Sequence, residues 1–246
     1  MARPNYIELA RDVRIPILYE DRSVLAIDKP PGWMLVPVSW QRTSWNLQAA
    51  LMSSIAAGHF WARSRNLKYL KYIHRLDAET SGILLLAKSQ GALNTFSDLF
   101  ETRQMEKVYL AVTTQAPKQN SWTCQLSLAP DSKQIGRIIV SPHGKPSETE
   151  FRVVTSANGK HLIEARPYSG RQHQIRVHLT QSGCPILGDE LYGGGDGELA
   201  LRAVGLAYRD PFTRKPISIR APVEEFLSAC GFPENSYRVE LSRRQY

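Results

Sequence analysis

Residues 71–82 read Lys-Tyr-Ile-His-Arg-Leu-Asp-Ala-Glu-Thr-Ser-Gly, and residues 83–87 continue as Ile-Leu-Leu-Leu-Ala. A polar, charged segment therefore runs directly into five apolar residues. That apolar run lies between a Ser-Gly pair and a Lys-Ser pair, and it has the length of a strand buried on both faces. Asp77 is then expected in a turn that leads into the core, where a carboxylate needs a partner to stay ionised. The segment is either a solvated turn before a strand or a carboxylate held for chemistry.

The composition is that of an ordinary globular protein. The 246 residues are 42% hydrophobic and 22% charged, and they can bury a substantial core as one domain or two small ones. Lys and Arg total 31 against 23 Asp and Glu, which gives a net charge of +8. This surplus favours a polyanionic partner such as nucleic acid, although many basic proteins bind no polyanion.

The three cysteines, Cys124, Cys184 and Cys230, form no Cys-x-x-Cys pair. Such an odd set predicts reduced thiols in a cytoplasmic protein rather than a disulfide framework. The N-terminus lacks the apolar run of a signal peptide, and no stretch approaches the ~18 apolar residues of a membrane span. We therefore expect a cytoplasmic protein with no membrane partner.

The N-terminal third combines a strand with a looser, basic segment. Residues 1–16 mix charges with prolines and are expected as an arm laid over the domain. Residues 23–28 predict a strand that ends at Lys29-Pro30-Pro31-Gly32, because proline cannot continue a ladder. Residues 38–72 interleave cations with aromatic side chains, which suits phosphate contacts and base stacking. The tryptophans could equally be core residues and the cations a solvated face, so both interpretations stay open.

The middle of the chain predicts regular elements. Ser89 as N-cap, with apolar residues at helical spacing after it, predicts a helix to about residue 102. Residues 107–112 alternate as a half-buried strand, with Tyr109 on the face opposite the valines. Residues 148–154 and 162–165 predict two more strands, and the Asn-Gly pair between them predicts a type I′ hairpin.

Residues 169–179 carry signals for both a strand and a helix. Apolar residues alternate along them, as in a strand. Ser169 as N-cap and Gly183 as a stop favour a helix of about three turns instead. Because the start and stop signals agree, we predict a helix, whose first turn would offer N–H groups to an anion beside Arg171.

The C-terminal part begins with a glycine-rich loop at residues 188–197, which lacks the spacing and the terminal Lys-Ser/Thr of a phosphate-binding loop. Residues 199–206 and 217–220 predict closing strands, and Pro222 begins a short helix. No repeat or linker divides the chain. One composite domain is therefore the simplest organisation.

A metal site, a protein kinase and a serine hydrolase are the other functions to consider. Four possible metal ligands fall close together: His161, His173, His178 and Cys184. They lack zinc spacing, so a metal site is disfavoured. The order His-Arg-Leu-Asp at residues 74–77 also occurs in protein-kinase catalytic loops, yet the downstream Asn, the Asp-Phe-Gly and the ATP loop are missing. No serine-hydrolase elbow occurs. What remains is Asp77 with several arginines, and spacing alone does not choose its partner.

At this point four stretches resemble one known family. Residues 74–85 resemble the signature of the RluA-like RNA pseudouridine synthases. Residues 28–32 are similar to the family's Lys-Pro-x-Gly, and residues 106–111 to its tyrosine motif. Residues 169–179, with 185–189 following, resemble its Gly-Arg-x-His-Gln-Ile-Arg-x-His motif. The stretches occur in the right order, and the resemblance covers about residues 17–227.

The resemblance implies that Asp77 is the catalytic carboxylate that converts uridine in RNA to pseudouridine, without a metal or organic cofactor. Tyr109 would stack on the flipped uracil and act near C5, and Leu201 would pack on the other side of the base. Arg176 would form the ion pair that keeps Asp77 charged. Arg75 would help to extrude the nucleotide. The other substrate-binding residues implied are His74, Arg171 and His173.

The resemblance also implies an α+β fold, the pseudouridine synthase catalytic fold, with a mixed, mostly antiparallel sheet, flanking helices and a central RNA-binding cleft. We expect an arm at 1–16, a catalytic domain at 17–230 and a tail at 231–246. The arm is too short for the S4 RNA-binding domain that many relatives carry. The expected protein is a monomer that acts on ribosomal or transfer RNA.

Two departures from the family pattern stand out. Cys184 and Arg202 replace usual histidines, and we expect them to affect substrate preference more than chemistry. The main alternative to an enzyme is a non-catalytic RNA-binding protein that retains the synthase fold. The presence of Asp77, Tyr109 and Arg176 together favours the enzyme.

Overall fold

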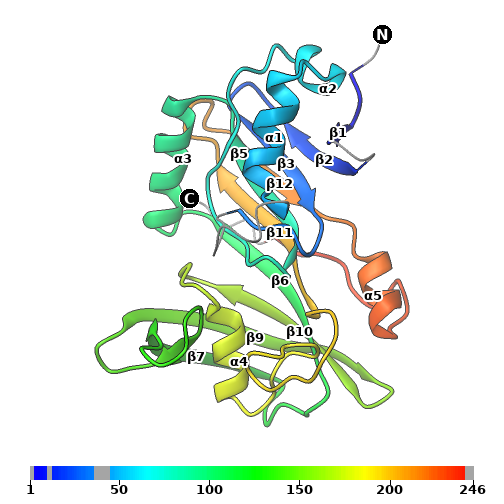
Figure 1. Cartoon of the computed structure of the whole chain (residues 1–246). Coiled ribbons are helices and arrows are strands. Elements are labelled where there is room, and N and C mark those ends of the chain that lie inside the picture. The colour runs from blue at the N-terminus through cyan, green and yellow to red at the C-terminus, as the bar shows by residue number, and fades with distance from the viewer. Residues whose placement is uncertain (1–2, 10–12, 36–44, 242–246) are drawn as a thin grey trace. The chain divides into compact units, whose positions relative to one another are not determined.

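The computed structural model describes residues 3–9, 13–35 and 45–241. The chain forms two compact units, each made of two segments (Figure 1). Unit 1 comprises Met1–Gln104 and Tyr208–Ala221, and unit 2 comprises Met105–Ala207 and Pro222–Tyr246. None of the described helices is long and apolar enough to cross a membrane.

The strands of unit 1 pair in the order β1-β2-β3-β5, each antiparallel to the next. Their bounds are β1 Tyr6–Glu8, β2 Arg14–Glu20, β3 Val24–Lys29 and β5 Ser81–Ala87. The short β4, Lys71–Tyr72, also pairs with β5. Residues 82–87 of β5 are all buried, which confirms the strand expected from their apolar run.

The N-terminal segment contributes to this sheet. In the pairing of β1 with β2, Ile7 lies opposite Ile15, and both side chains are completely buried. Residues 6–8 and 14–16 are therefore part of the sheet, and burial of the two isoleucines stabilises their pairing. The expected boundary at residue 16 stays a prediction.

The helices of unit 1 are α1, α2 and α3, and α1 lies across the sheet in Figure 1. Their bounds are Leu47–Ala56, Phe60–Arg63 and Gln90–Glu101. The hydroxyl of Ser89 accepts a hydrogen bond from the Ala92 N–H at 3.1 Å, so Ser89 is the N-cap of α3 as predicted. Phe96 anchors this helix, because it is fully buried and its ring meets Tyr208 edge to face.

The strands of unit 2 pair in the order β11-β6-β10-β9-β7-β8. Their bounds are β6 Glu106–Thr113, β7 Ser121–Pro130, β8 Ile138–Val140, β9 Lys145–Ala157, β10 Lys160–Pro167 and β11 Leu201–Arg209. All these pairs are antiparallel. Asn158 and Gly159 have φ of 53° and 70°, the positive values that a type I′ turn requires, so the predicted hairpin is confirmed. Strand β12, Pro216–Arg220, belongs to unit 1 and pairs with β11, whose last two residues, Tyr208 and Arg209, are also assigned to unit 1.

Helix α4, Gln174–Gln181, confirms the predicted helix but not its start. Ser169 is not the N-cap, because its hydroxyl donates to the side-chain carbonyl of Gln174 at 2.8 Å. His173 precedes the helix in the left-handed region, with φ of 51°, so the helix begins later in the chain than predicted. Gly183, with φ of 81°, lies just beyond the helix end as expected.

The core of unit 2 lies between its sheet and its helices. It includes Val108, Leu110, Phe151, Leu162 and Leu179, all completely buried or nearly so. Helix α5, Glu224–Cys230, adds its apolar residues to this core. With antiparallel strands and flanking helices in each unit, the expected α+β class is confirmed.

Candidate active site

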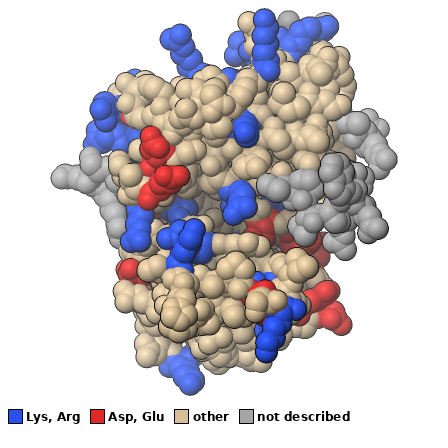
Figure 2. Space-filling view, turned by 60° about the vertical axis from the view of Figure 1, so that its left-hand side comes forward, with Lys and Arg blue, Asp and Glu red and all other residues tan. Residues whose placement is uncertain are grey.

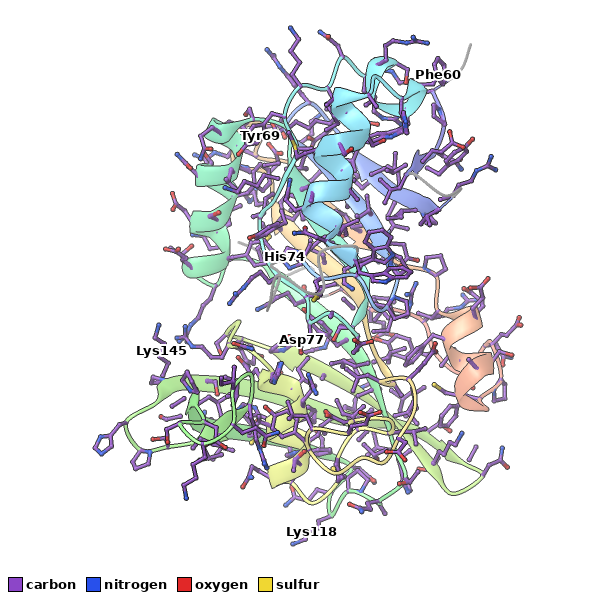
Figure 3. All side chains as sticks on the ribbon, viewed as in Figure 1. Phe60, Tyr69, His74, Asp77, Lys118 and Lys145 are labelled. Carbon is purple, nitrogen blue, oxygen red and sulfur yellow. The ribbon has the colours of Figure 1, made fainter. Side chains whose placement is uncertain are left out.

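Asp77 lies in an irregular segment of unit 1 between β4 and β5, as expected from the sequence. Figure 3 shows it on the same segment as His74. The N–H of Ile73 donates to the carbonyl of Leu85 at 3.0 Å, and the N–H of Thr80 donates to the carbonyl of Asp77 at 3.2 Å. These bonds fix the backbone on both sides of Asp77, whose side chain is half-buried.

A buried lysine also holds this segment. The ammonium of Lys29 donates to the carbonyls of Pro30, Trp33 and Ala78 at 2.9, 3.1 and 2.7 Å. The Ala78 carbonyl also accepts from the N–H of Gly32 at 2.9 Å. All three donors of the ammonium are thus directed at backbone, and one of them meets the residue directly after Asp77.

The electrostatics of Lys29 follow from this burial. Its side chain is completely buried, and burial lowers its pKa to about 8, while the charges of Glu79 and Asp77 act in the opposite direction. The sequence places Lys29 in the stop after a strand and in the resemblance motif at residues 28–32. It does not predict the role of Lys29 in fixing the Asp77 segment, because a lysine next to two prolines gives no sign of burial.

The structure gives His74 and Arg75 different environments. The His74 Nε2 accepts a hydrogen bond from the N–H of Leu85 at 3.1 Å, and the ring stacks on Phe100 with centroids 4.6 Å apart. His74 therefore joins the segment to β5 and α3. The side chain of Arg75 is exposed. A substrate contact by either residue stays a prediction.

In unit 2, the structure brings Tyr109 and Leu201 together. Tyr109 on β6 lies opposite Ala203 on β11, and Leu201 lies opposite Ala111. Directly paired residues point to the same face of a sheet, and so do residues two apart along a strand. Tyr109 and Leu201 are therefore diagonal neighbours on one face. Leu201 is buried and Tyr109 is half-buried.

Arg176 on α4 forms an ion pair that the sequence did not predict. Its Nε and Nη2 donate to the two carboxylate oxygens of Asp189, each at 2.8 Å. The guanidinium carbon also lies 5.1 Å from the centroid of the Tyr192 ring. The only available signal was the position of Asp189 within a resemblance motif, which gives Asp189 no role of its own. The expected contact of Arg176 with Asp77 stays a proposal.

Arg171 and His173 lie in the loop before α4. The Nε of Arg171 donates to the Pro146 carbonyl at 3.2 Å, and Nδ1 of His173 is 2.9 Å from the hydroxyl of Tyr192. Arg171 precedes α4, and its backbone bonds to the first helical residue: its N–H donates to the side-chain carbonyl of Gln174 at 3.0 Å, and its carbonyl accepts from the Gln174 N–H at 3.2 Å. His173 thus belongs to the same group of contacts as Arg176.

The basic segment at residues 38–72 contains both core residues and exposed cations, so each of the two interpretations left open by the sequence holds for part of it. Trp61 is buried, and Arg65 pairs with Glu20 at 2.8 Å with only 4% of its side chain exposed. Lys68 and Lys71 are exposed and remain available to phosphates. Trp40 and Arg42 lie outside the described residues. Figure 2 shows Lys and Arg side chains spread over one face of the molecule.

The histidines and cysteines considered as metal ligands have other environments. His161 bonds with Ser156, and His178 bonds with Ser147. Cys184 is completely buried in the core of unit 2, where burial raises the pKa of its thiol to about 11. No group of three or more metal-binding side chains occurs among the described residues. The other departure, Arg202, donates to the carbonyl of Pro222 at 3.0 Å.

Comparison with known proteins identifies the family. Residues 23–181, more than half of the chain, match the family model described as RNA pseudouridylate synthase. The chain belongs to this family. The matched region contains Asp77, Tyr109 and Arg176, the three residues to which the resemblance assigned chemistry.

Two bacterial relatives show how far the similarity extends. The chain is 34% identical over 223 residues to ribosomal large subunit pseudouridine synthase C of Vibrio vulnificus, which covers 86% of this chain and 66% of that protein. It is 33% identical over 228 residues to the protein of the same name from Escherichia coli, covering 87% and 68%. The chain thus spans about two thirds of the length of these relatives.

Solved structures support the fold. Human RNA pseudouridylate synthase domain containing 1 aligns with a TM-score of 0.69 at 22% identity and covers 94% of this chain and 92% of that chain. Human RNA pseudouridylate synthase domain containing 4 aligns with a TM-score of 0.67 at 23% identity, covering 83% and 87%. The expected pseudouridine synthase fold is therefore confirmed.

Proposed function

We propose that this protein isomerises uridine to pseudouridine in RNA, and that its substrate is large-subunit ribosomal RNA. The reaction breaks the bond between uracil N1 and ribose C1′ and forms a bond between C5 and C1′, while C5 loses a proton and N1 gains one. Family membership and the names of the two bacterial relatives support this assignment. Transfer RNA is the second substrate to test.

The proposal rests chiefly on the way the protein holds Asp77. A carboxylate that acts as nucleophile or base must be ionised and must meet the sugar or the ring in a fixed geometry. The bonds from Lys29, Gly32 and Thr80 hold the backbone of Asp77 and of the following residue in place. We assign Asp77 as the catalytic carboxylate.

The remaining assignments follow from unit 2. We propose that Tyr109 stacks on the flipped uracil and that Leu201 packs against the base, since both lie on one face of the sheet. Arg176 would supply the positive charge that keeps Asp77 ionised. Arg75, with its exposed side chain, would hold the RNA in place of the extruded nucleotide.

Pseudouridine mapping tests the proposed function in the cell. Ribosomal and transfer RNA from cells with and without the gene would be compared position by position. We expect loss of one or more pseudouridines from large-subunit ribosomal RNA, restored by the wild-type gene but not by Asp77→Asn. Loss of pseudouridines from transfer RNA alone would show that transfer RNA is the substrate. An unchanged map would support the alternative of a non-catalytic RNA-binding protein.

The assembly and the location of the protein are further proposals. We expect a monomer, because each unit buries its own apolar core, and we expect it to act in the cytoplasm, where ribosomal RNA is available. Light scattering of the purified protein, with and without RNA, tests the first expectation. Fractionation of cells tests the second.

A further inference from the structure

The glycine-rich loop at residues 188–197 forms a tight support in unit 2. A Cβ on Gly188 would lie 2.0 Å from the carbonyl oxygen of Glu198, and one on Gly194 would lie 1.7 Å from that of Ile186. The carbonyl of Asp189 accepts from the N–H of Gly194 at 2.8 Å. The loop therefore closes so tightly that two of its positions exclude any side chain, and this closure fixes Asp189.

Asp189 uses this fixed position to hold Arg176. Asp189 is 1% exposed, and both of its carboxylate oxygens accept hydrogen bonds from the guanidinium at 2.8 Å. Arginine has five N–H donors, and this pair uses one on Nε and one on Nη2.

Tyr192, from the same loop, covers the guanidinium and is itself held in orientation. Its hydroxyl accepts from the N–H of Ile138 at 2.8 Å and donates to the Ile138 carbonyl at 3.1 Å. Nδ1 of His173 lies 2.9 Å from the same oxygen. The ring position is thus set from β8 and from the start of α4. The Arg176 side chain would otherwise sample many rotamers. Asp189 holds one edge of its guanidinium and Tyr192 covers one face.

We propose that Asp189 is a positioning residue, which aims Arg176 for its part in the isomerisation. The inference rests on the proposed function, because Arg176 acts in it as the cation that keeps the catalytic carboxylate charged. The function of the glycine-rich loop is then to carry Asp189 and Tyr192 rather than to bind a phosphate. A purely structural role for the ion pair is the competing explanation, and the two roles predict different kinetics.

The first test compares Asp189→Asn with wild type on the RNA substrate. The amide keeps the size of the side chain but offers only one acceptor, so the guanidinium is no longer held at two points. We expect kcat per folded molecule to fall about 10- to 100-fold, with KM for RNA changed by less than about twofold. An unchanged kcat with a lower melting temperature would show a structural role only and would overturn the proposal.

The matched control is Asp210→Asn. Asp210 is also buried, at 3% exposure, and its carboxylate caps a turn by accepting from the N–H groups of Phe212 and Thr213. This variant removes a buried carboxylate that has no part in the hydrogen bonds of Arg176 with Asp189. It is expected to lose stability with an unchanged kcat. An equal fall in kcat in both variants would contradict a specific role for Asp189.

A double variant tests whether Asp189 acts through Arg176. Arg176→Lys removes the fork geometry, so Asp189→Asn added to it should lower kcat by less than about twofold more. If the two substitutions lowered kcat by independent factors that multiply, the positioning role would be overturned.

The Nε–H signal of Arg176 in NMR supplies a readout without turnover. The proton should exchange slowly with water in wild type and rapidly in Asp189→Asn. Wild type without activity on any RNA would refute the proposed function instead, and the Nε–H signal would still decide whether Asp189 holds Arg176.

Discussion

At the scale of single residues, Lys29 shows how a buried charge can serve a neighbouring segment. Replacing it by Met removes a donor from three carbonyls. The Ala78 carbonyl keeps its bond from the Gly32 N–H, whereas the Pro30 and Trp33 carbonyls lose the ammonium, and a carbonyl left unsatisfied costs about 1–3 kcal/mol. Removing the buried charge returns part of that cost, since the pKa of Lys29 is lowered to about 8. We expect Lys29→Met to lower the free energy of unfolding by roughly 2–4 kcal/mol.

Chemical denaturation measures this change, and Lys68→Met is the control. Lys68 is exposed, so its replacement should change the free energy of unfolding by less than about 0.5 kcal/mol. Lys29→Met protein that folds should also show a lower kcat, because the Ala78 carbonyl, next to Asp77, loses one of its two donors. Full stability and full activity in Lys29→Met would contradict this account of the segment.

His178 makes the free energy of unfolding depend on pH. Ser147 donates its hydroxyl proton to the Leu126 carbonyl, so Nε2 of His178 must be the donor in its bond to Ser147. Nδ1 is buried with no partner among the described residues, and burial lowers the pKa of His178 from 6.5 to about 4. Between these values the unfolded chain binds more protons than the folded one. Stability therefore falls as the pH falls from 6.5 to 4.

The expected loss from His178 is about 3 kcal/mol across this range. Urea unfolding of wild type and His178→Phe at several pH values measures it, and the pH dependence of the variant should be shallower by about this amount. His143→Gln is the control, because His143 is exposed. Parallel pH profiles for wild type and His178→Phe would disprove the assignment.

At the scale of elements, the loop that carries Asp189 depends on close backbone approach. Gly188 has φ of +76°, and a Cβ there would lie 2.0 Å from a carbonyl oxygen. Gly193 has a similar φ of +87°, but a Cβ there meets nothing within 4 Å. We expect Gly193→Ala to cost about 1 kcal/mol from its backbone conformation alone. Gly188→Ala should cost several times more, because the backbone must also move.

Thermal unfolding of the two alanine variants measures the difference. The displaced loop in Gly188→Ala should also disturb the ion pair of Asp189 with Arg176, so kcat should fall in this variant and be kept in Gly193→Ala. Equal melting temperatures for the two variants would show that the loop is not closed as tightly as described.

Elements with local signals could be predicted from the sequence. The buried strand β5, the Ser89 cap of α3 and the hairpin at Asn158-Gly159 each depend on a few neighbouring residues. The start of α4 could not be predicted, because the Ser169 hydroxyl bonds to the Gln174 side chain instead of capping the helix. Hydrogen-bond partners of this kind depend on side-chain conformations that spacing does not encode.

The candidate site likewise contains residues that the sequence could identify and residues that it could not. Asp77 and Tyr109 could be singled out by the resemblance, and their positions in a turn and on a strand followed from local patterns. Asp189 as the partner of Arg176 could not be predicted, since the two residues meet only because the glycine-rich loop folds back on α4. The burial of Lys29 likewise depends on contacts with residue 78, far along the chain.

At the scale of the whole molecule, the chain divides into two units without a linker to mark them. Each unit takes one long segment and one short segment from residues 208–246, and no shift in composition shows the boundary. The net charge of +8, in contrast, could be read directly from the sequence. Its consequence for RNA binding depends on which cations are exposed, and only the structure separates Arg65, which is paired, from Lys68 and Lys71.

These exposed lysines give a prediction for RNA binding. Replacing Lys68 and Lys71 together by Ala should weaken binding and reduce the dependence of log K on log salt by about one unit for each phosphate that the variant no longer neutralises. Filter binding at several salt concentrations measures both effects. Lys118→Ala is the control, because Lys118 is exposed in unit 2, outside the basic segment. An unchanged salt dependence in the double variant would exclude this surface from the RNA interface.

The central claim is that Asp77 carries out the isomerisation, and one measurement tests it most directly. RNA labelled with tritium at C5 of uridine releases tritium to water when C5 becomes bonded to ribose. Wild type and Glu79→Gln, a control that removes an exposed carboxylate from the same segment, should both release tritium. Asp77→Asn should bind RNA with little change in affinity and release none above background. Appreciable tritium release by folded Asp77→Asn would contradict the account.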